Sequence, residues 1–178
     1  HDIDILQWLI GKKCKKVQSF GSLSYFNRAN KPEGSPERCI EGCPYGDECF
    51  YNSVNLYLED KDNGWFRSAA ARTPTNPSDE LVEKALRESE YGKCVFNCNN
   101  DVVDHQVVNL EYEDGVTATF TMSAFNKGGR SIRIMGTKGE LFGDAGDSYI
   151  SFYNFETRET EKYEYADILQ VQDITGGH

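Results

Sequence analysis

Three cysteines lie close together in a stretch of the sequence that is rich in proline and glycine. Cys39, Cys43 and Cys49 follow the spacing C-x3-C-x5-C. Tight turns could bring their thiolates around one Zn²⁺ ion, with Cys14 or a histidine as the fourth ligand. The spacing differs from the C-x2-C of a zinc knuckle, and free thiols packed as small apolar side chains, or one local disulfide, fit the same residues. The sequence leaves these interpretations open.

A second group of residues combines carboxylates with a histidine. Asp101, Asp104 and His105 stand directly before a predicted strand. An imidazole beside carboxylates can accept a proton or bind a hydroxyl group, so Asp104 and His105 are candidate substrate-binding residues. The run Asn99-Asn100-Asp101 is also ordinary turn chemistry, which would require no function.

Charge and missing motifs exclude several classes of protein. The 178 residues carry 19 Lys and Arg against 29 Asp and Glu, a net charge of −10, which argues against a nucleic acid or an anionic membrane as partner. No apolar run approaches the ~18 residues of a membrane span. The sequence has no G-x-G-x-x-G after a strand, no G-x-x-x-x-G-K-[ST], no H-E-x-x-H and no G-x-S-x-G. It therefore lacks the usual dinucleotide-binding and phosphate-binding motifs and the signatures of a self-contained metalloprotease or serine hydrolase.

Acidic charge and only six cysteines favour a reducing, cytoplasmic location.

Two helices are predicted from the spacing of apolar residues. Residues 1–11 and 78–87 have the periodicity of amphipathic helices. Gly11 is a natural stop for the first helix, and Ser78 is a suitable N-cap for the second. Ile3, Leu6, Leu9 and Ile10 fall on one face of the first helix, and Leu81, Val82, Ala85 and Leu86 are expected to form the buried stripe of the second.

The remaining segments are predicted to be mostly strands. A strand over 17–26 is followed by an irregular segment over 27–47, and Cys94 and Cys98 are placed on a further strand. In the second half, apolar and polar residues alternate on both sides of Asp114-Gly115, which is a strong hairpin signal. Further strands are predicted at 132–134, 140–142, 149–155 and 162–165.

These elements predict an α+β fold for residues 1–178, taken as a single domain. An open, mainly antiparallel β-sheet would carry its helices on one face, because one side of the hairpin is apolar. The opposite face carries Thr117, Thr119, Thr121 and Ser123, and it is either solvated or packed against a second copy of the chain.

Several motifs carry a resemblance to a known family. His1-Asp2-Ile3-Asp4 runs into an apolar helix and resembles the H-[DE]-x-D segment that opens the substrate domain of the glucose–fructose oxidoreductase / inositol dehydrogenase (Gfo/Idh/MocA) family. The hairpin over 107–124 and the run IRIMGTKGEL over 132–141 resemble that family's sheet and its i-x-G-t-k-G-x-l turn. The final Gly176-Gly177-His178 is similar to the start of a Gly-His-Gly-Gly segment in such proteins.

The resemblance implies the C-terminal substrate domain of a two-domain oxidoreductase that acts on a sugar or cyclitol hydroxyl. NAD or NADP would be bound by an N-terminal Rossmann domain that is absent from this sequence, as is the family's Glu-Lys-Pro lysine. Family members commonly associate through the sheet, so the polar sheet face is expected to form a homo-oligomer. The alternative is a non-catalytic binding or scaffold module with a zinc-clipped cysteine loop.

The same resemblance makes His1 the expected catalytic residue, as general base or as orienter of the proton transfer. The positive end of a helix dipole disfavours imidazolium and so keeps an acceptor nitrogen available. Asp4, three residues later, would orient the imidazole by binding it, or would only complement the helix dipole. A histidine that merely caps the helix is the alternative for His1.

Overall fold

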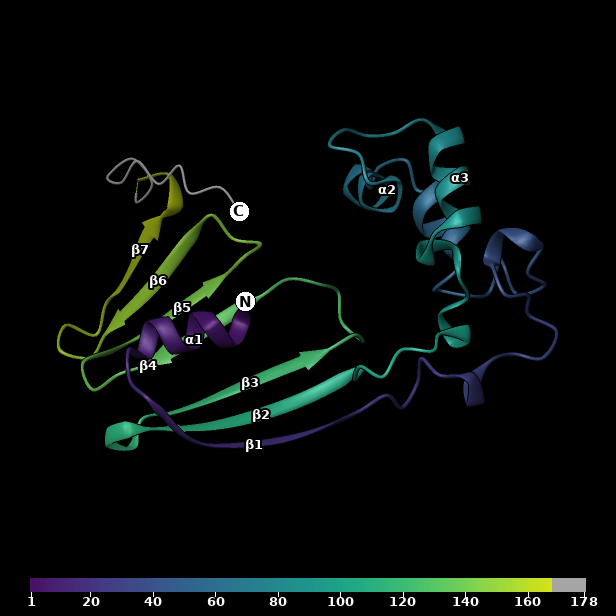
Figure 1. Ribbon diagram of the computed structural model, residues 1–178. Coiled ribbons are helices and arrows are strands. Elements are labelled where there is room, and N and C mark those ends of the chain that lie inside the picture. The colour runs from purple at the N-terminus through teal and green to yellow at the C-terminus, as the bar shows by residue number, and fades with distance from the viewer. Residues whose placement is uncertain (168–178) are drawn as a thin grey trace. The chain divides into compact units, whose positions relative to one another are not determined.

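The computed structural model describes residues 1–167 (Figure 1). Two compact units follow one another along the chain and divide after Phe125. Hydrogen bonds join β1, β2 and β3 into one sheet in the first unit and β4 to β7 into another in the second, and every pairing is antiparallel. The predicted α+β class is confirmed, whereas the division of the strands between two sheets was not predicted from their patterns.

The first unit begins with a helix and contains a three-stranded sheet. Its elements are α1 (Asp2–Ile10), β1 (Cys14–Ser22), β2 (His105–Tyr112) and β3 (Thr117–Ser123). The predicted hairpin is confirmed, and its turn places Asp114 and Gly115 at positive φ. The strand predicted over 17–26 begins and ends earlier than expected.

Helix α1 covers the apolar face of this sheet (Figure 1). The buried side chains of the sheet are Val108, Leu110 and Tyr112, and Leu6 and Ile10 of α1 pack against them. Ile3 and Leu9, which were placed on the same face as Leu6 and Ile10, are exposed. A short helix on a three-stranded sheet contacts it along a narrow i, i+4 stripe, which here consists of Leu6 and Ile10.

A long segment between β1 and β2 folds into short helices. These are η1 (Arg28–Asn30), η2 (Cys39–Glu41), η3 (Val54–Glu59), α2 (Gly64–Ala71), α3 (Asp79–Glu88), η4 (Glu90–Gly92) and η5 (Val95–Asn97). The predicted helix over 78–87 is confirmed as α3. The predicted strand around Cys94 and Cys98 is wrong, because a 3-10 turn lies between the two cysteines.

Helix α3 is held by two fully buried side chains and by a buried arginine of α2. Val82 and Leu86 are completely buried, whereas Leu81, which was predicted to be buried, is exposed. Arg67 donates to the carbonyl oxygens of residues 57, 58 and 77 and to the side chains of Asn76 and Asp79. Its guanidinium thus ties the start of α3 to η3 and α2.

The second unit is a four-stranded meander. It consists of β4 (Ser131–Met135), β5 (Gly139–Asp144), β6 (Tyr149–Asn154) and β7 (Thr160–Glu164), which confirms the four strands predicted here. Gly139 lies so close to Phe152 that a Cβ at this position would stand 2.4 Å from the ring. The Gly176-Gly177-His178 motif lies outside the described residues. No described helix has the length and apolar character needed to cross a membrane.

Candidate functional site

Asp104 is buried where β2 begins, and four donors surround its carboxylate. The backbone amides of Tyr25 and Phe26 donate to Oδ2 at 2.7 and 3.2 Å. The Ser24 hydroxyl donates to Oδ1 at 3.3 Å, and Nδ1 of His105 lies 2.8 Å from the same oxygen. The carboxylate therefore fixes the turn after β1 and the adjacent imidazole together.

The charge state of Asp104 follows from these contacts. Burial by itself would raise the pKa of the carboxyl group, but the hydrogen bonds from the Tyr25 amide, His105 and the neighbouring amides outweigh it. The pKa of Asp104 is held well below its ordinary value, so the group is an anion at neutral pH. An ionised carboxylate only accepts hydrogen bonds, and Nδ1 of His105 must therefore carry a proton.

The other ring nitrogen of His105, Nε2, lies beside a hydroxyl group of the neighbouring strand. The side chain of His105 is 46% exposed, while that of Asp104 is 2% exposed. Nε2 lies 3.4 Å from the Ser22 hydroxyl on the neighbouring strand. With Nδ1 protonated, Nε2 of the neutral ring is a hydrogen-bond acceptor. The arrangement can bind a hydroxyl group or take its proton, with Asp104 as the residue that orients the base.

His1 occupies the other candidate position, directly before α1. Its carbonyl accepts the first hydrogen bond of the helix, from the Ile5 amide at 2.9 Å, and its side chain makes no capping hydrogen bond. Asp4 lies in the first turn and is exposed. Over residues 1–167 the structure shows no hydrogen bond between Asp4 and His1, and the first-turn carboxylate complements the helix dipole. The expected role of Asp4 in substrate binding stays a prediction.

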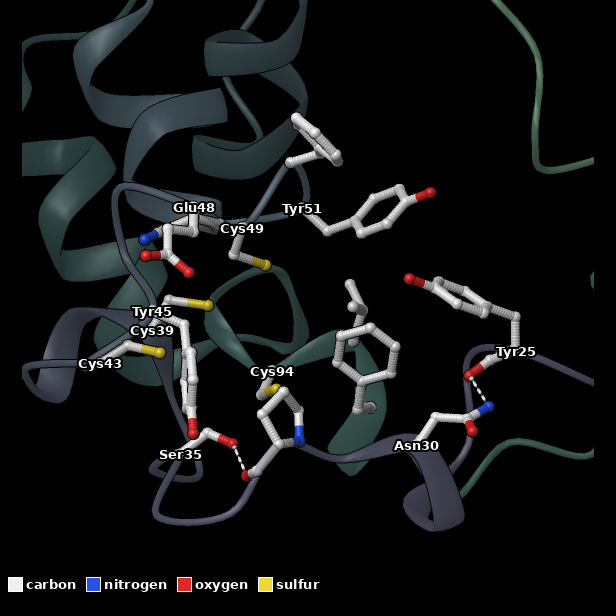
Figure 2. Close-up of a pocket in the computed structure, with 15 residues that line it drawn as sticks. Tyr25, Asn30, Ser35, Cys39, Cys43, Tyr45, Glu48, Cys49, Tyr51 and Cys94 are labelled. Atoms are coloured by element: carbon white, nitrogen blue, oxygen red, sulfur yellow. Dashed lines mark hydrogen bonds between the residues drawn. The ribbon is translucent and has the colours of Figure 1, made fainter.

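The cysteine loop forms one side of a pocket of about 440 Å³. Cys39, Cys43 and Cys49 line it, as does Cys94, which is 45 positions further along the chain than Cys49 (Figure 2). All six cysteines are free thiols. Burial raises the pKa of the Cys94 thiol, an effect that the backbone amides of Phe96 and Asn97 partly oppose.

Aromatic rings form the remaining wall of this pocket. Tyr25, Tyr51 and Phe96 line it and pack edge to face on one another, with centroid separations of 5.4 to 6.5 Å. Tyr25 belongs to the turn after β1 that Asp104 fixes. Tyr25 and Ser22 were not predicted as site residues from the sequence, because nothing marked them except their position on or near the end of a predicted strand.

The thiols are not gathered into a ready metal centre. Within residues 1–167, no group of three or more His, Cys, Asp or Glu side chains is arranged to hold a metal ion. The expected set of Cys39, Cys43 and Cys49 with Cys14 or a histidine is not brought together, and Cys14 lies in β1, where its thiol contacts backbone carbonyls of residues 16 and 111.

Comparison with known protein families gives one match across nearly the whole chain. The model of the oxidoreductase family C-terminal alpha/beta domain, Gfo/Idh/MocA, matches residues 1–175. The chain belongs to this family. A curated relative named "Putative oxidoreductase YteT", from Bacillus subtilis (strain 168), is 24% identical over 193 aligned residues. The alignment covers all of this chain but 42% of that protein, so the chain spans less than half of the relative's length. No solved structure matches the chain significantly.

Membership of the Gfo/Idh/MocA family agrees with the motifs that suggested it. The H-D-I-D segment opens α1, and the G-T-K-G run forms the connection between β4 and β5, where the Gly136 amide donates to the Gly139 carbonyl at 2.9 Å. The family match supports an oxidoreductase domain, without a named substrate.

Proposed function

We propose that this chain is the substrate-binding and oligomerisation domain of an NAD(P)-dependent oxidoreductase that acts on a sugar or cyclitol hydroxyl. The family match over residues 1–175 carries the proposal. The sequence holds no dinucleotide fingerprint, so the nicotinamide cofactor is assigned to an N-terminal Rossmann domain of the full-length protein. This chain then supplies groups that bind the substrate and accept its proton.

His1 is the proposed proton acceptor. Oxidation of a secondary alcohol requires a base within hydrogen-bond reach of the hydroxyl as the hydride leaves for the cofactor. The position at the start of α1 suits a neutral imidazole, because the helix dipole disfavours its protonation. His105 is proposed to bind the substrate, since its side chain is partly exposed, and Asp104 is proposed to support that binding by orienting the imidazole.

The test uses the full-length protein with NAD⁺ or NADP⁺ and a panel of polyols, aldoses and cyclitols. We expect nicotinamide reduction with at least one of them. Replacing the proton acceptor by His1→Ala should lower kcat by roughly 10²–10⁴-fold. His105→Gln should mainly raise KM. Arg87→Met, on the exposed side of α3, is the matched control and should leave both constants unchanged.

Two outcomes would refute this assignment. An upstream sequence without a G-x-G-x-x-[GA] strand–loop–helix would favour the non-catalytic module instead. If the enzyme is active and the kcat of His1→Ala equals that of the wild type, His1 is not the proton acceptor.

The open face of the first sheet is the proposed contact with a second copy. Strand register places Phe20, Val107 and Thr121 in one row across β1, β2 and β3, on the face opposite α1. All three are exposed, and the first two are large apolar side chains in an otherwise polar surface. Sedimentation analysis should show an oligomer that Phe20→Asp dissociates; unchanged sedimentation of the variant would exclude this face.

A further inference from the structure

We propose that the helical segment between β1 and β2 carries a binding groove for a neutral oligosaccharide, formed by two adjoining pockets. The class of ligand rests on the proposed function, which assigns a sugar or cyclitol substrate to this chain. The groove binds sugar residues beyond the one whose hydroxyl is oxidised, so the substrate is an oligosaccharide rather than a free monosaccharide.

A second pocket adjoins the one that the cysteine loop lines. Tyr51 and Val95 belong to the linings of both, so the two pockets meet at these side chains. All lining residues lie between positions 25 and 98, within the first unit. The volumes are about 440 and 370 Å³, and each falls within the ~300–1,000 Å³ of small-molecule sites.

The first pocket begins beside the proposed substrate-binding histidine. The Tyr25 amide and Nδ1 of His105 bind the two oxygens of the Asp104 carboxylate, at 2.7 and 2.8 Å. The ring of Tyr25 lines the pocket, and its centroid lies 6.0 Å from that of Tyr51. Figure 2 shows these two rings together on the side of the pocket away from Cys43. A ligand bound at His105 can therefore continue past Tyr25 into the first pocket and past Tyr51 into the second.

The second pocket combines aromatic faces with uncharged hydrogen-bonding groups. Tyr51, Tyr57 and Tyr91 line it, and the hydroxyls of Tyr51 and Tyr91 make no hydrogen bond within residues 1–167. A sugar ring presents C–H groups on its faces and hydroxyls at its edge. A tyrosine offers the matching combination of an apolar face and a polar tip.

The charges around the pockets favour a neutral ligand. Lys93 is the one cationic side chain among the described residues that line them, and Glu90 pairs with it at 2.9 Å. Glu48 adds a carboxylate to the first pocket. A phosphate or carboxylate on the ligand would meet this negative charge without a free cation, whereas sugar hydroxyls can donate hydrogen bonds to it.

Ser53 provides the observation that points most directly to a ligand. It lines the second pocket and is 3% exposed. Its Oγ is the one buried side-chain nitrogen or oxygen within residues 1–167 that has no hydrogen-bond partner. A buried hydroxyl without a partner costs free energy, and a hydrogen bond from a ligand hydroxyl would remove this cost.

The test measures binding to the full-length protein by calorimetric titration, without a nicotinamide cofactor. The probes are the β-1,4-linked series of glucose, xylose and galactose and the α-1,4-linked series of glucose, each from one to four residues. We expect the Kd to fall roughly tenfold or more between the monosaccharide and the trisaccharide of at least one series. An affinity that rises with length in none of them would overturn the proposal.

Three variants separate binding from folding. Ser53→Ala should raise the Kd for the trisaccharide roughly 2–10-fold, which is the worth of one neutral hydrogen bond. Its urea midpoint should equal or exceed that of the wild type, because the change removes a buried hydroxyl that has no partner. Tyr91→Ala should raise the Kd by a similar factor through the loss of an aromatic face. Ser68→Ala, in α2 and outside both linings, is the control and should leave the Kd unchanged.

The outcomes distinguish the groove from the oxidoreductase activity. A Kd of Ser53→Ala equal to that of Ser68→Ala, with a lowered urea midpoint, would make Ser53 structural and overturn the groove. Oxidation of monosaccharides without any gain from longer sugars would also overturn it while leaving the proposed function intact. Length-dependent binding that Ser53→Ala weakens, in a protein that reduces no nicotinamide with any sugar, would establish the groove and refute the proposed function.

Discussion

Replacement of Arg67 should destabilise the helical segment more than any exposed charge change on the same helices. Arg67 is 2% exposed and donates five hydrogen bonds. Arg67→Met keeps an unbranched apolar stem of similar reach but removes every donor. The carbonyl oxygens of Tyr57, Leu58 and Pro77 then lose a charged partner.

The size of the effect follows from the acceptors that remain. Asp79 is half exposed and can be rehydrated, so its loss contributes little. The other four acceptors, at about 1 kcal/mol for each net hydrogen bond, give about 4 kcal/mol. Removal of one partner from a buried charged network typically costs ~3–5 kcal/mol, which agrees. With a urea m-value of ~1–3 kcal/mol/M, the unfolding midpoint should fall by roughly 1–4 M.

Urea unfolding followed by circular dichroism measures this midpoint. Arg87→Met is the matched control, because its i, i+4 pair with Glu83 is exposed on both sides and should be worth about 0.3–0.5 kcal/mol. A midpoint for Arg67→Met that differs from wild type by no more than the control does would refute the reasoning.

Three further outcomes are expected for the stability and folding of the chain. The pKa of Asp104 is lower in the folded than in the unfolded chain, so the carboxylate stabilises the fold above about pH 4 and this stabilisation is lost as the pH falls below that value. The loss of unfolding free energy in Asp104→Asn, relative to wild type, should therefore become smaller in acid. A loss that does not depend on pH between 2 and 7 would contradict this. Leu86→Ala, at a fully buried position, should lower the free energy of unfolding by about 2–5 kcal/mol. Leu81→Ala, at a position that is 49% exposed, should lower it by well under 1 kcal/mol. Equal losses would show that the assigned faces of α3 are wrong. Gly92→Ala should prevent soluble expression, because the new Cβ would stand 1.6 Å from the Leu86 carbonyl oxygen; Gly34→Ala, with open space around it, should cost only about 1–2 kcal/mol for its positive φ.

Local patterns sufficed for the strands and for two helices. The hairpin of β2 and β3 was predictable because period-2 alternation and an Asp-Gly turn specify pairing between neighbours in sequence. Gly11 and Ser78 marked helix ends for the same local reason. The prediction for α3 included too many buried residues, because the neighbouring segments cover Val82 and Leu86 but leave Leu81 exposed to solvent.

Features that depend on distant contacts were not predictable. Cys94 and Cys98 have the alternation of a strand, but the Glu37 carbonyl and the pairing of Arg38 with Lys93 hold that segment as a turn. Asp104 could be picked out beside His105 as a candidate. Its main partners, the amides of the turn after β1, lie about eighty positions earlier and leave no mark in the local sequence.

The position of Asp104 links the sheet, the aromatic wall of the pocket and His105 through one carboxylate. One oxygen holds the Tyr25 and Phe26 amides, and the other binds Nδ1 of His105. A substitution at Asp104 therefore disturbs the pocket wall as well as the imidazole, and its effect on activity cannot be assigned to either alone. His105→Gln removes the imidazole while leaving the amide contacts of the carboxylate in place. If His105 binds substrate, this variant raises KM, whereas a purely structural histidine would lower the stability and leave KM unchanged.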